Sequence, residues 1–280
     1  MIRSRRTRRL WSKKSYYRNI WWLLAGVTVL VVLIAGYVLW LDDSEVVEQI
    51  TNQVKKSDES EQSTAVQPAF DKTKYSLIES ASPWVVVNKS RKLPSSYRAA
   101  DLVVPKVTLR YPTGGSEMQL RTEAAQALQE MFTAAQSDGV KLMLASGFRS
   151  YNTQSAVYSR HVRDYGQTEA DKVSARPGHS EHQTGWATDV APASGKCVIA
   201  DCFGEMAEGR WVAANSAKYG FIIRYPAGKK SLTGYSYEPW HLRYVGVELA
   251  AEIAMGGQTL EQFFGLPTYS SYPSDILQLQ

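Results

Sequence analysis

An uncharged apolar segment at residues 20–41 is the feature that most limits what this chain can fold into. It reads IWWLLAGVTVLVVLIAGYVLWL, 22 residues without an acidic or basic side chain. A helix of that length can cross the hydrocarbon core of a bilayer. Aromatic residues stand near both ends, where amphipathic rings favour the membrane interface. The segment therefore predicts one transmembrane helix.

The charges on either side predict its orientation. Residues 1–18 carry eight Lys and Arg side chains and no acid, whereas Asp42, Asp43 and Glu45 follow the apolar segment. Positive charge favours the cytoplasmic side, so we expect residues 1–19 to form a cytoplasmic tail and the remainder to lie outside the cell membrane. A cleaved signal peptide is the alternative. Its apolar region would be shorter and followed by small residues, so an uncleaved anchor is favoured.

The same tail explains the net charge of +5 and the pI of 9.0. Removing its eight positive charges leaves the rest of the chain with about three more acids than bases. The basic pI thus describes a juxtamembrane tail, and we expect no nucleic-acid partner for the remainder.

Three of the four histidines fall in two short segments, HSEHQTGWATD at 179–189 and EPWH at 238–241. A hydrolytic zinc site uses three protein ligands and leaves one position for water. A further carboxylate that is not a ligand takes the proton from that water. The residues suited to these four roles are His182, Asp189, His241 and Glu238.

Other assignments are compatible with the spacing. His179 could join His182 and His241 as a ligand, leaving Asp189 behind the metal, and the two arrangements are nearly even. Taken singly, Asp189 could be a turn residue and Glu238 could pair with Arg243. Gly185 predicts a turn that returns Asp189 to the metal, and Pro239 argues against a helix at Glu238. A bent strand end could still bring Glu238 and His241 into one cavity.

Composition divides the part beyond the membrane into three. Residues 42–74 are polar and poor in aromatics, which predicts an extracytoplasmic stalk. Residues 75–266 carry the apolar patterns of a folded domain, which we expect to be monomeric. Residues 267–280 are rich in Tyr, Ser and Pro and predict a loosely packed C-terminal tail.

Within the domain, helices and strands mix without regular alternation, which favours the α+β class. We expect a small mixed or antiparallel sheet with flanking helices around the zinc site. The predicted helices are 122–137, 151–165, 206–219 and 247–255, with Ser150 as a helix cap. The predicted strands are 84–88, 140–145 and 221–225, with another ending near 241–245.

The two cysteines, Cys197 and Cys202, bracket the sequence VIAD. Outside the cell a close pair is more often oxidised than free, which predicts a disulfide. So short a closed loop contributes roughly 2 kcal/mol in the chain-entropy model. A Cys-x4-Cys zinc site would need two further ligands, and the chain has no other cysteine.

The two histidine segments, read as Ser180-x-His182-x-x-Gly185-x-Ala187-x-Asp189 and Glu238-x-x-His241, resemble the VanY-type D-alanyl-D-alanine carboxypeptidases. This M15-like family of zinc metallopeptidases includes cell-wall L,D-carboxypeptidases. The resemblance extends to SGFRSY at 146–151 and to the segment 220–226, and covers roughly residues 84–265. It implies that His182, Asp189 and His241 bind Zn²⁺ and that Glu238 is the base. His179 then has a place on the pocket wall or behind the ligands.

The resemblance also implies substrate contacts. Arg149 and Gln154 match residues that contact the substrate, and a guanidinium can bind a terminal carboxylate through two parallel hydrogen bonds. We expect Ser180 to bond the peptide backbone and Tyr225 to line the pocket. Trp240 is expected to pack beside the zinc.

Together these observations predict a membrane-anchored zinc D,D-carboxypeptidase that removes the terminal D-alanine of peptidoglycan stem peptides. L,D-carboxypeptidase activity on tetrapeptide stems and endopeptidase activity are alternatives. A zinc-stabilised cell-wall-binding module without activity is a third. Glu238 argues against the module because structural zinc needs no base, and Arg149 favours cleavage at a chain end. D,D and L,D specificity differ in the stereocentre upstream of the cleaved bond, and both stay open here.

Overall fold

The computed structural model describes residues 30, 37 and 70–280. The chain divides into two units, residues 1–70 and residues 71–280, and the described residues lie almost wholly in the second. The predicted tail, transmembrane helix and stalk therefore lie almost wholly outside the described residues and stay predictions. Within the part that the structure describes, no helix is both long enough and apolar enough to cross a bilayer.

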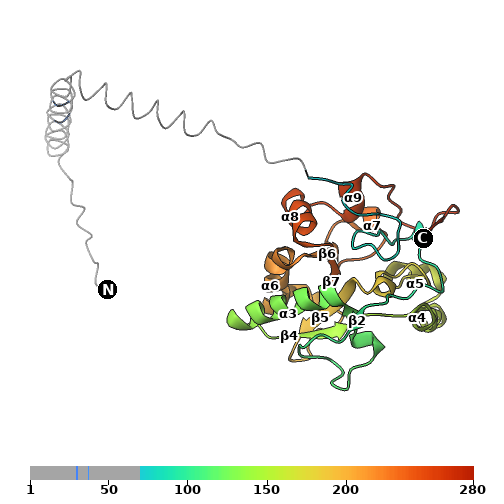
Figure 1. Ribbon diagram of the computed structural model, residues 1–280, viewed down its shortest axis with the longest axis horizontal. Helices are drawn as coiled ribbons and strands as arrows, with labels where there is room; N and C mark the ends of the chain where they lie inside the picture. The colour runs from blue at the N-terminus through green and yellow to red at the C-terminus, as the bar shows by residue number, and fades with distance from the viewer. Residues whose placement is uncertain (1–29, 31–36, 38–69) are drawn as a thin grey trace, which may run out of the picture. The chain divides into compact units, whose positions relative to one another are not determined.

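A four-stranded antiparallel sheet forms the centre of the second unit (Figure 1). Its strand order is β4-β5-β7-β6. The bounds are β4 Leu142–Ser146, β5 Ala187–Pro192, β6 Phe221–Tyr225 and β7 Glu238–Tyr244. Two further pairs are β1 Arg91–Lys92 with β8 Leu277–Gln278, parallel, and β2 Leu102–Val103 with β3 Leu120–Arg121, antiparallel. Small sheets with flanking helices agree with the predicted mixture of α and β structure.

Helices α3 and α4 begin and end where the sequence predicts. α3 spans Thr122–Ser137 and α4 spans Tyr151–Tyr165, where the Ser150 side chain accepts a hydrogen bond from the Thr153 amide. The predicted helix 206–219 is instead two elements, α6 Ala207–Asn215 and the 3-10 turn η4 Ser216–Tyr219. The other helices are α5 Gln167–Val173, α7 Lys230–Thr233, α8 Val247–Gly256 and α9 Leu260–Phe264. The other 3-10 turns are η1 Ser116–Met118, η2 Glu181–Thr184 and η3 Asp201–Glu205.

The main core lies between α3 and one face of the sheet. Leu128 and Met131 of α3 share a fully buried cluster with Leu144, Val190 and Leu242 of the strands. Successive residues of a strand point to opposite faces. The neighbours of Val190 and Leu242 therefore lie on the other face, and this is where the polar residues of β5 and β7 gather.

Residues 84–88 are buried but do not form the predicted strand. Val85, Val86 and Val87 are fully buried, and the segment makes one isolated bridge, from Asn88 to Arg91. Its backbone is held by separate hydrogen bonds instead of a ladder, because the Val86 amide donates to the Leu77 carbonyl and the Val85 carbonyl accepts from the Arg243 guanidinium at 2.8 Å. The apolar run correctly indicated that these residues are buried, but the prediction of a strand was wrong.

Residues 267–280, expected as a loosely packed tail, belong to the same compact unit as the rest of the domain. Leu279 is buried in the main core, and its amide donates to the Lys92 carbonyl at 2.8 Å. Tyr272 packs edge-on against His179 with ring centroids 4.9 Å apart. The burial of Leu279 and the ring contact of Tyr272 hold the segment in place.

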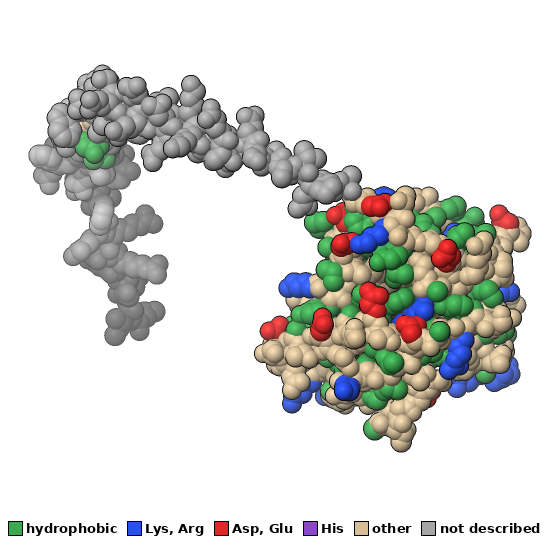
Figure 2. Space-filling view, viewed as in Figure 1, with side chains coloured by type: hydrophobic (Ala, Val, Ile, Leu, Met, Phe, Trp, Pro, Cys, Tyr) green, Lys and Arg blue, Asp and Glu red, His purple; other side chains and the backbone are tan. Residues whose placement is uncertain are grey.

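The surface of the unit 71–280 carries mixed charges on the face drawn in Figure 2. Acidic, basic and apolar side chains are interspersed there. No single basic patch is seen on that face among the residues that are drawn in colour.

Strand β7 changes register along its length. Ile223 of β6 pairs with Leu242, whereas Tyr225 pairs with Glu238. A regular antiparallel ladder would pair Tyr225 with Trp240. Such an irregularity re-aims side chains at the end of a strand. Glu238 and His241 consequently reach the same cavity from one strand.

Four fully buried charges lie beside this sheet. The Arg224 Nε and the Arg243 Nη1 both donate to Oε1 of Glu181 at 2.8 Å. Arg224 also binds the Glu261 carboxylate with two nitrogens, at 2.5 and 3.0 Å. Two guanidinium groups thus balance two carboxylates. Removal of one partner from such a set costs about 3–5 kcal/mol because a buried charge is left uncompensated.

We expect Glu261→Gln to lower the free energy of unfolding by about 3–5 kcal/mol at pH 7. Burial by itself raises the pKa of Glu261, but Arg224 lowers it more, so its net pKa lies below the ordinary value. A depressed pKa stabilises the fold above the unfolded-state pKa of about 4.3 and loses this effect as the pH falls. Urea titrations of the full chain should therefore show a steeper loss below about pH 4.3 in the wild type than in the variant.

Glu169 offers a matched control because it is exposed and pairs with Lys172 on the surface. Glu169→Gln should change the unfolding free energy by less than about 0.5 kcal/mol. Equal stability of the wild type and Glu261→Gln at pH 7 would contradict the importance of the buried charges.

Candidate metal centre and its cavity

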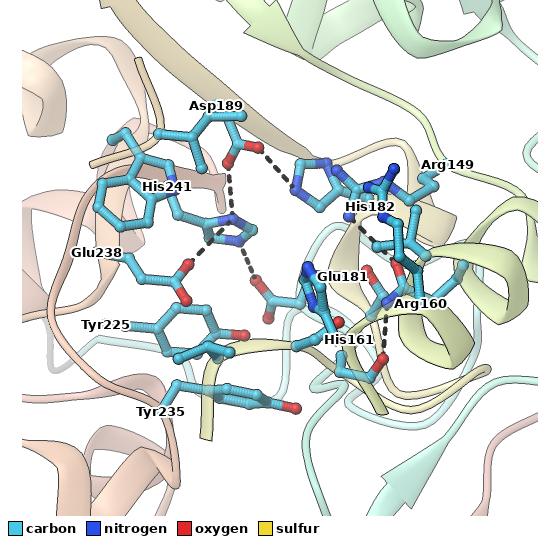
Figure 3. Close-up of a pocket in the computed structure, with 18 residues that line it drawn as sticks. Arg149, Arg160, His161, Glu181, His182, Asp189, Tyr225, Tyr235, Glu238 and His241 are labelled. Carbon is cyan, nitrogen blue, oxygen red and sulfur yellow. Dashed lines mark hydrogen bonds and ion pairs between the residues drawn. The ribbon is translucent and has the colours of Figure 1, made fainter. Parts of the chain in front are cut away.

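Three of the predicted ligands converge on one point (Figure 3). Asp189 on β5 and His241 on β7 are directly opposite each other in the antiparallel ladder. The Asp189 Oδ1 lies 3.0 Å from His241 Nδ1, and its Oδ2 lies 3.4 Å from His182 Nε2. One ligand atom from each residue can be chosen so that all three lie within 4.8 Å of one another. All three side chains are buried.

The backbone of the loop after β4 orients His182. Its Nδ1 lies 2.6 Å from the Gly147 carbonyl, which can only accept, so Nδ1 carries the proton and Nε2 keeps its lone pair. An imidazole held in this way presents the other nitrogen to a metal. Gly185 closes η2 with a φ of +76°, a conformation that favours glycine. The chain then enters β5, as the predicted turn requires.

Glu181 has a role that the sequence reasoning missed. Its Oε2 faces Nε2 of His241 at 3.6 Å, and both atoms are buried without a hydrogen-bond partner among the described residues. The other oxygen, Oε1, is held by Arg224 and Arg243. A metal-binding histidine commonly directs its second nitrogen to a carboxylate. The signal in the sequence that could have indicated this role is the position of a charged residue between Ser180 and His182, in a buried segment.

The electrostatic environment of the cluster favours binding of a cation. Burial lowers the pKa of His182, which favours the neutral, metal-binding form of the ring. Burial also disfavours a charged His241, but Asp189 and Glu181 outweigh this and raise its pKa to about 9. Burial opposes ionisation of Asp189 as well, and the two histidines nevertheless hold its pKa well below the usual range. The negative potential that retains a proton on His241 would equally favour a divalent ion, which displaces that proton on binding.

Glu238 stands beside the cluster without belonging to it. Its Oε2 lies 3.9 Å from His241 Nδ1. Burial raises the pKa of this carboxyl to about 7, partly offset by the charge of His241. A group that ionises near neutrality is well suited to accept and return a proton at physiological pH. The alternative pairing of Glu238 with Arg243 is wrong, because Arg243 binds Glu181.

The cluster opens into a cavity of about 350 Å³. Arg149 and Glu238 lie on opposite sides of the histidines (Figure 3). The Arg149 guanidinium donates to Oε1 of Gln154 at 3.1 Å and to Oγ of Ser146 at 3.0 Å. Gln154 is itself fixed through a hydrogen bond to the Ala175 carbonyl. Two neutral acceptors thus orient Arg149 and leave its positive charge without a carboxylate partner among residues 70–280.

Three other predicted residues also line the cavity: Ser180, Tyr225 and Trp240. Tyr225 stacks on the His241 ring at a centroid distance of 5.1 Å. It also packs against Tyr235, a lining residue that the sequence analysis did not select. Arg160 and His161 of α4 are further wall residues that were missed. They come from a helical segment that carries no recognisable motif.

His179 does not take part in the cluster. Its Nδ1 is 2.8 Å from the Asn88 carbonyl, and its ring contacts Tyr272. It is absent both from the metal cluster and from the cavity lining among the described residues. The rival ligand set and the pocket-wall role are therefore both wrong for His179. The C-terminal segment occupies the space beside this ring.

Cys197 and Cys202 are joined by a disulfide, the pairing expected from the sequence. The loop between them contributes Ile199 to the cavity wall. The end of this loop forms the beginning of η3, which packs against β7.

The sequence profile of the VanY family, D-alanyl-D-alanine carboxypeptidase, matches residues 117–247. The protein YodJ of Bacillus subtilis is 44% identical over 179 residues, which cover 64% of this chain and 66% of YodJ. The chain therefore spans slightly less than two thirds of that relative's length.

Two solved structures are also similar. The LD-carboxypeptidase LdcB is 40% identical, with a TM-score of 0.64, and the match covers 71% of this chain and 89% of LdcB. The vancomycin-resistance D,D-pentapeptidase VanY, solved as a mutant in complex with Zn(II), is 32% identical, with a TM-score of 0.55. That match covers 64% of this chain and 97% of VanY. With the His182, Asp189 and His241 cluster in place, these similarities show that the chain belongs to the VanY family of D-alanyl-D-alanine carboxypeptidases.

Proposed function

We propose that this protein is a zinc-dependent carboxypeptidase that removes the terminal D-alanine from peptidoglycan stem peptides. The observation that carries the proposal is one cavity with three parts. A buried metal-binding cluster lies in its middle, the carboxyl group of Glu238 lies on one side, and the unpaired guanidinium of Arg149 lies on the other. Cleavage at a free chain end requires this combination of hydrolytic and carboxylate-binding groups.

His182, Asp189 and His241 would hold the metal, and Glu181 would keep His241 in position. Zinc in such a set supplies Lewis-acid chemistry, by making water more acidic and stabilising negative charge on a carbonyl oxygen. Glu238 takes the proton of the attacking water and passes it to the amine of the departing D-alanine. Its raised pKa, about 7, suits both transfers.

Arg149 provides the expected recognition of the chain end. A guanidinium and a carboxylate form two parallel charge-assisted hydrogen bonds when both are held in plane. Ser146 and Gln154 restrict Arg149 to one orientation before substrate arrives. Pre-orientation of this kind reduces the entropy that binding must overcome. An endopeptidase would have no use for a cation at this end of the cavity.

Of the two specificities, we propose L,D cleavage of tetrapeptide stems as the main activity. The sequence alone favours D,D cleavage. The comparison with solved structures supports the reverse order, because LdcB resembles this chain more in sequence and fold than VanY does. D,D cleavage of pentapeptide stems is the second candidate, supported by the family profile.

The proposed site of action is outside the cell membrane, with the catalytic unit tethered by residues 20–41 and the N-terminus in the cytoplasm. The uncharged length of that segment and the basic residues before it support this placement. The disulfide agrees with an oxidising compartment.

Replacement of Glu238, the proposed base, should lower turnover without removing the metal. We expect Glu238→Gln to retain about one zinc per chain and to lose about 10²–10⁴-fold in turnover, the usual contribution of general base catalysis. Elemental analysis and D-alanine release would measure the two effects. Glu205→Gln is the control, because Glu205 is an exposed carboxylate at the end of η3 that does not line the cavity. Undiminished turnover in Glu238→Gln would exclude the proposed base.

A second comparison tests the ligand set. His182→Ala should lose bound zinc because one of three ligand side chains is removed. His179→Ala should keep the metal, because its ring lies outside the cluster. Zinc content after dialysis of the purified full-length variants distinguishes the two. Metal loss in His179→Ala with retention in His182→Ala would reverse the assignment.

The order of the two specificities is measurable with defined stem peptides. The zinc-loaded full chain should release one alanine from tetrapeptide muropeptides faster than from pentapeptide muropeptides, as followed by mass spectrometry. Faster release from pentapeptides would establish the second candidate instead. Release from neither would refute the carboxypeptidase proposal.

A further inference from the structure

The loop closed by the Cys197–Cys202 disulfide has an unusual backbone. Cys197 and Ile199 have φ values of +50° and +53°, and they are the two non-glycine residues with positive φ in the described part of the chain. A β-branched residue such as Ile199 is a genuine outlier in this region. A conformation of this kind is unfavourable and persists where the surroundings enforce it. Here the disulfide joins the two ends of the loop across the strained residue.

The strained side chain faces the catalytic cavity. Ile199 lines the same cavity as the metal cluster while 39% of it stays exposed to solvent. A side chain at this position contributes little to the core of the fold. It does contribute an apolar contact that a molecule in the cavity can use.

The loop lies on the Glu238 side of the cavity. Residues 201–205 form η3, and Gly204 within it is so close to Tyr237 and Pro239 that a Cβ would lie 2.7 Å from the Tyr237 hydroxyl. Tyr237 and Pro239 flank Glu238 in the chain. The charge of Asp201, two residues after Ile199, is also felt by the Glu238 carboxyl. Ile199 is therefore anchored next to the start of β7.

A bound peptide must cross the cavity in one direction. Its terminal carboxylate is placed by Arg149, and Glu238 lies on the other side of the metal cluster (Figure 3). The last residue consequently lies between Arg149 and the cluster. The residue upstream of the cleaved bond then emerges on the Glu238 side, where the loop stands.

From this arrangement we infer that Ile199 is a specificity-determining residue, which packs against the side chain of the peptide residue immediately upstream of the cleaved bond. The inference rests on the proposed carboxypeptidase function and its substrate orientation. It favours substrates whose upstream residue carries a long aliphatic stem over those with a methyl group. The disulfide supports the contact by holding Ile199 in its strained position.

Binding to a hydrolysis-blocked protein tests the contact directly. In the zinc-loaded full chain carrying Glu238→Gln, titration calorimetry gives dissociation constants for acetyl-L-Lys-D-Ala and acetyl-L-Ala-D-Ala. The two peptides share chirality and differ in the upstream side chain, which is a four-carbon stem with a terminal ammonium group in lysine and a methyl group in alanine. Adding Ile199→Ala should weaken binding of the lysine peptide about tenfold, the usual value of an aliphatic pocket contact. Binding of the alanine peptide should change less than about twofold, because a methyl group makes little of that contact.

Ile276→Ala is the matched control. Ile276 is 39% exposed, as Ile199 is, but it lines a different surface pocket. This variant should leave both dissociation constants unchanged. Equal weakening of both peptides by Ile199→Ala, or no weakening of either, would overturn the inference.

The contribution of the disulfide is read from a double-mutant cycle. Cys197→Ser with Cys202→Ser should weaken binding of the lysine peptide to a similar extent as Ile199→Ala. Combining all three changes should add little further loss, because both act on one contact. Fully additive losses would show that the disulfide does not act through Ile199.

The carboxypeptidase proposal is tested separately by D-alanine release from the wild-type chain. If the wild type releases no D-alanine, the proposed function fails, while the binding ratio still decides the role of Ile199. If release occurs and the ratio of the two dissociation constants is unchanged in Ile199→Ala, only the inference about Ile199 fails.

Discussion

The rest of the site depends on the contacts that the buried carboxylate of Glu181 makes with two arginines and one histidine. One oxygen is held by Arg224 and Arg243, and the other faces the His241 ring. The two arginines come from neighbouring strands, and Arg224 is balanced in turn by Glu261 of α9. Because each buried charge needs the next, the sheet, the last helix and the metal ligands hold one another in place. Arg243 also ties the 84–88 segment to this set through the Val85 carbonyl.

The two ends of the cavity carry groups of opposite type, a basic guanidinium at one end and an acidic carboxyl at the other. At the Arg149 end a fixed guanidinium is supported by neutral partners, so that its charge stays available. At the Glu238 end a buried carboxyl has a raised pKa, and the disulfide loop adds an apolar wall. The metal cluster lies between them. In the function that we propose, a peptide with a free carboxylate binds in one orientation, which is the property that separates a carboxypeptidase from an endopeptidase.

Much of the site was predictable from sequence, because its ligands lie in two short segments with regular spacing. The requirement of zinc chemistry for three ligands and a base pointed to His182, His241 and Glu238. It left Asp189 and His179 nearly even as the third ligand, and the resemblance to the VanY-type enzymes favoured Asp189. Helices 122–137 and 151–165 followed from apolar periodicity and a capping serine. Residues 84–88 failed as a strand because their backbone hydrogen bonds go to nearby turns and to two arginine side chains, one of them Arg243, more than 150 residues away. His179 had the right residue type at a suitable spacing, and only its contacts with Asn88 and Tyr272 remove it from the ligand set.

The sequence by itself determined the types of the metal-binding residues, the mixture of helices and strands and the pairing of the two cysteines, because these depend on local spacing and residue chemistry. Tertiary structure decided which carboxylate supports His241, which side of the cavity Arg149 and Ile199 occupy, and that residues 267–280 pack onto the domain. These features arise from contacts between segments far apart in the chain, and their energies depend on burial. Burial is a property of the whole fold, so no short segment carries it alone.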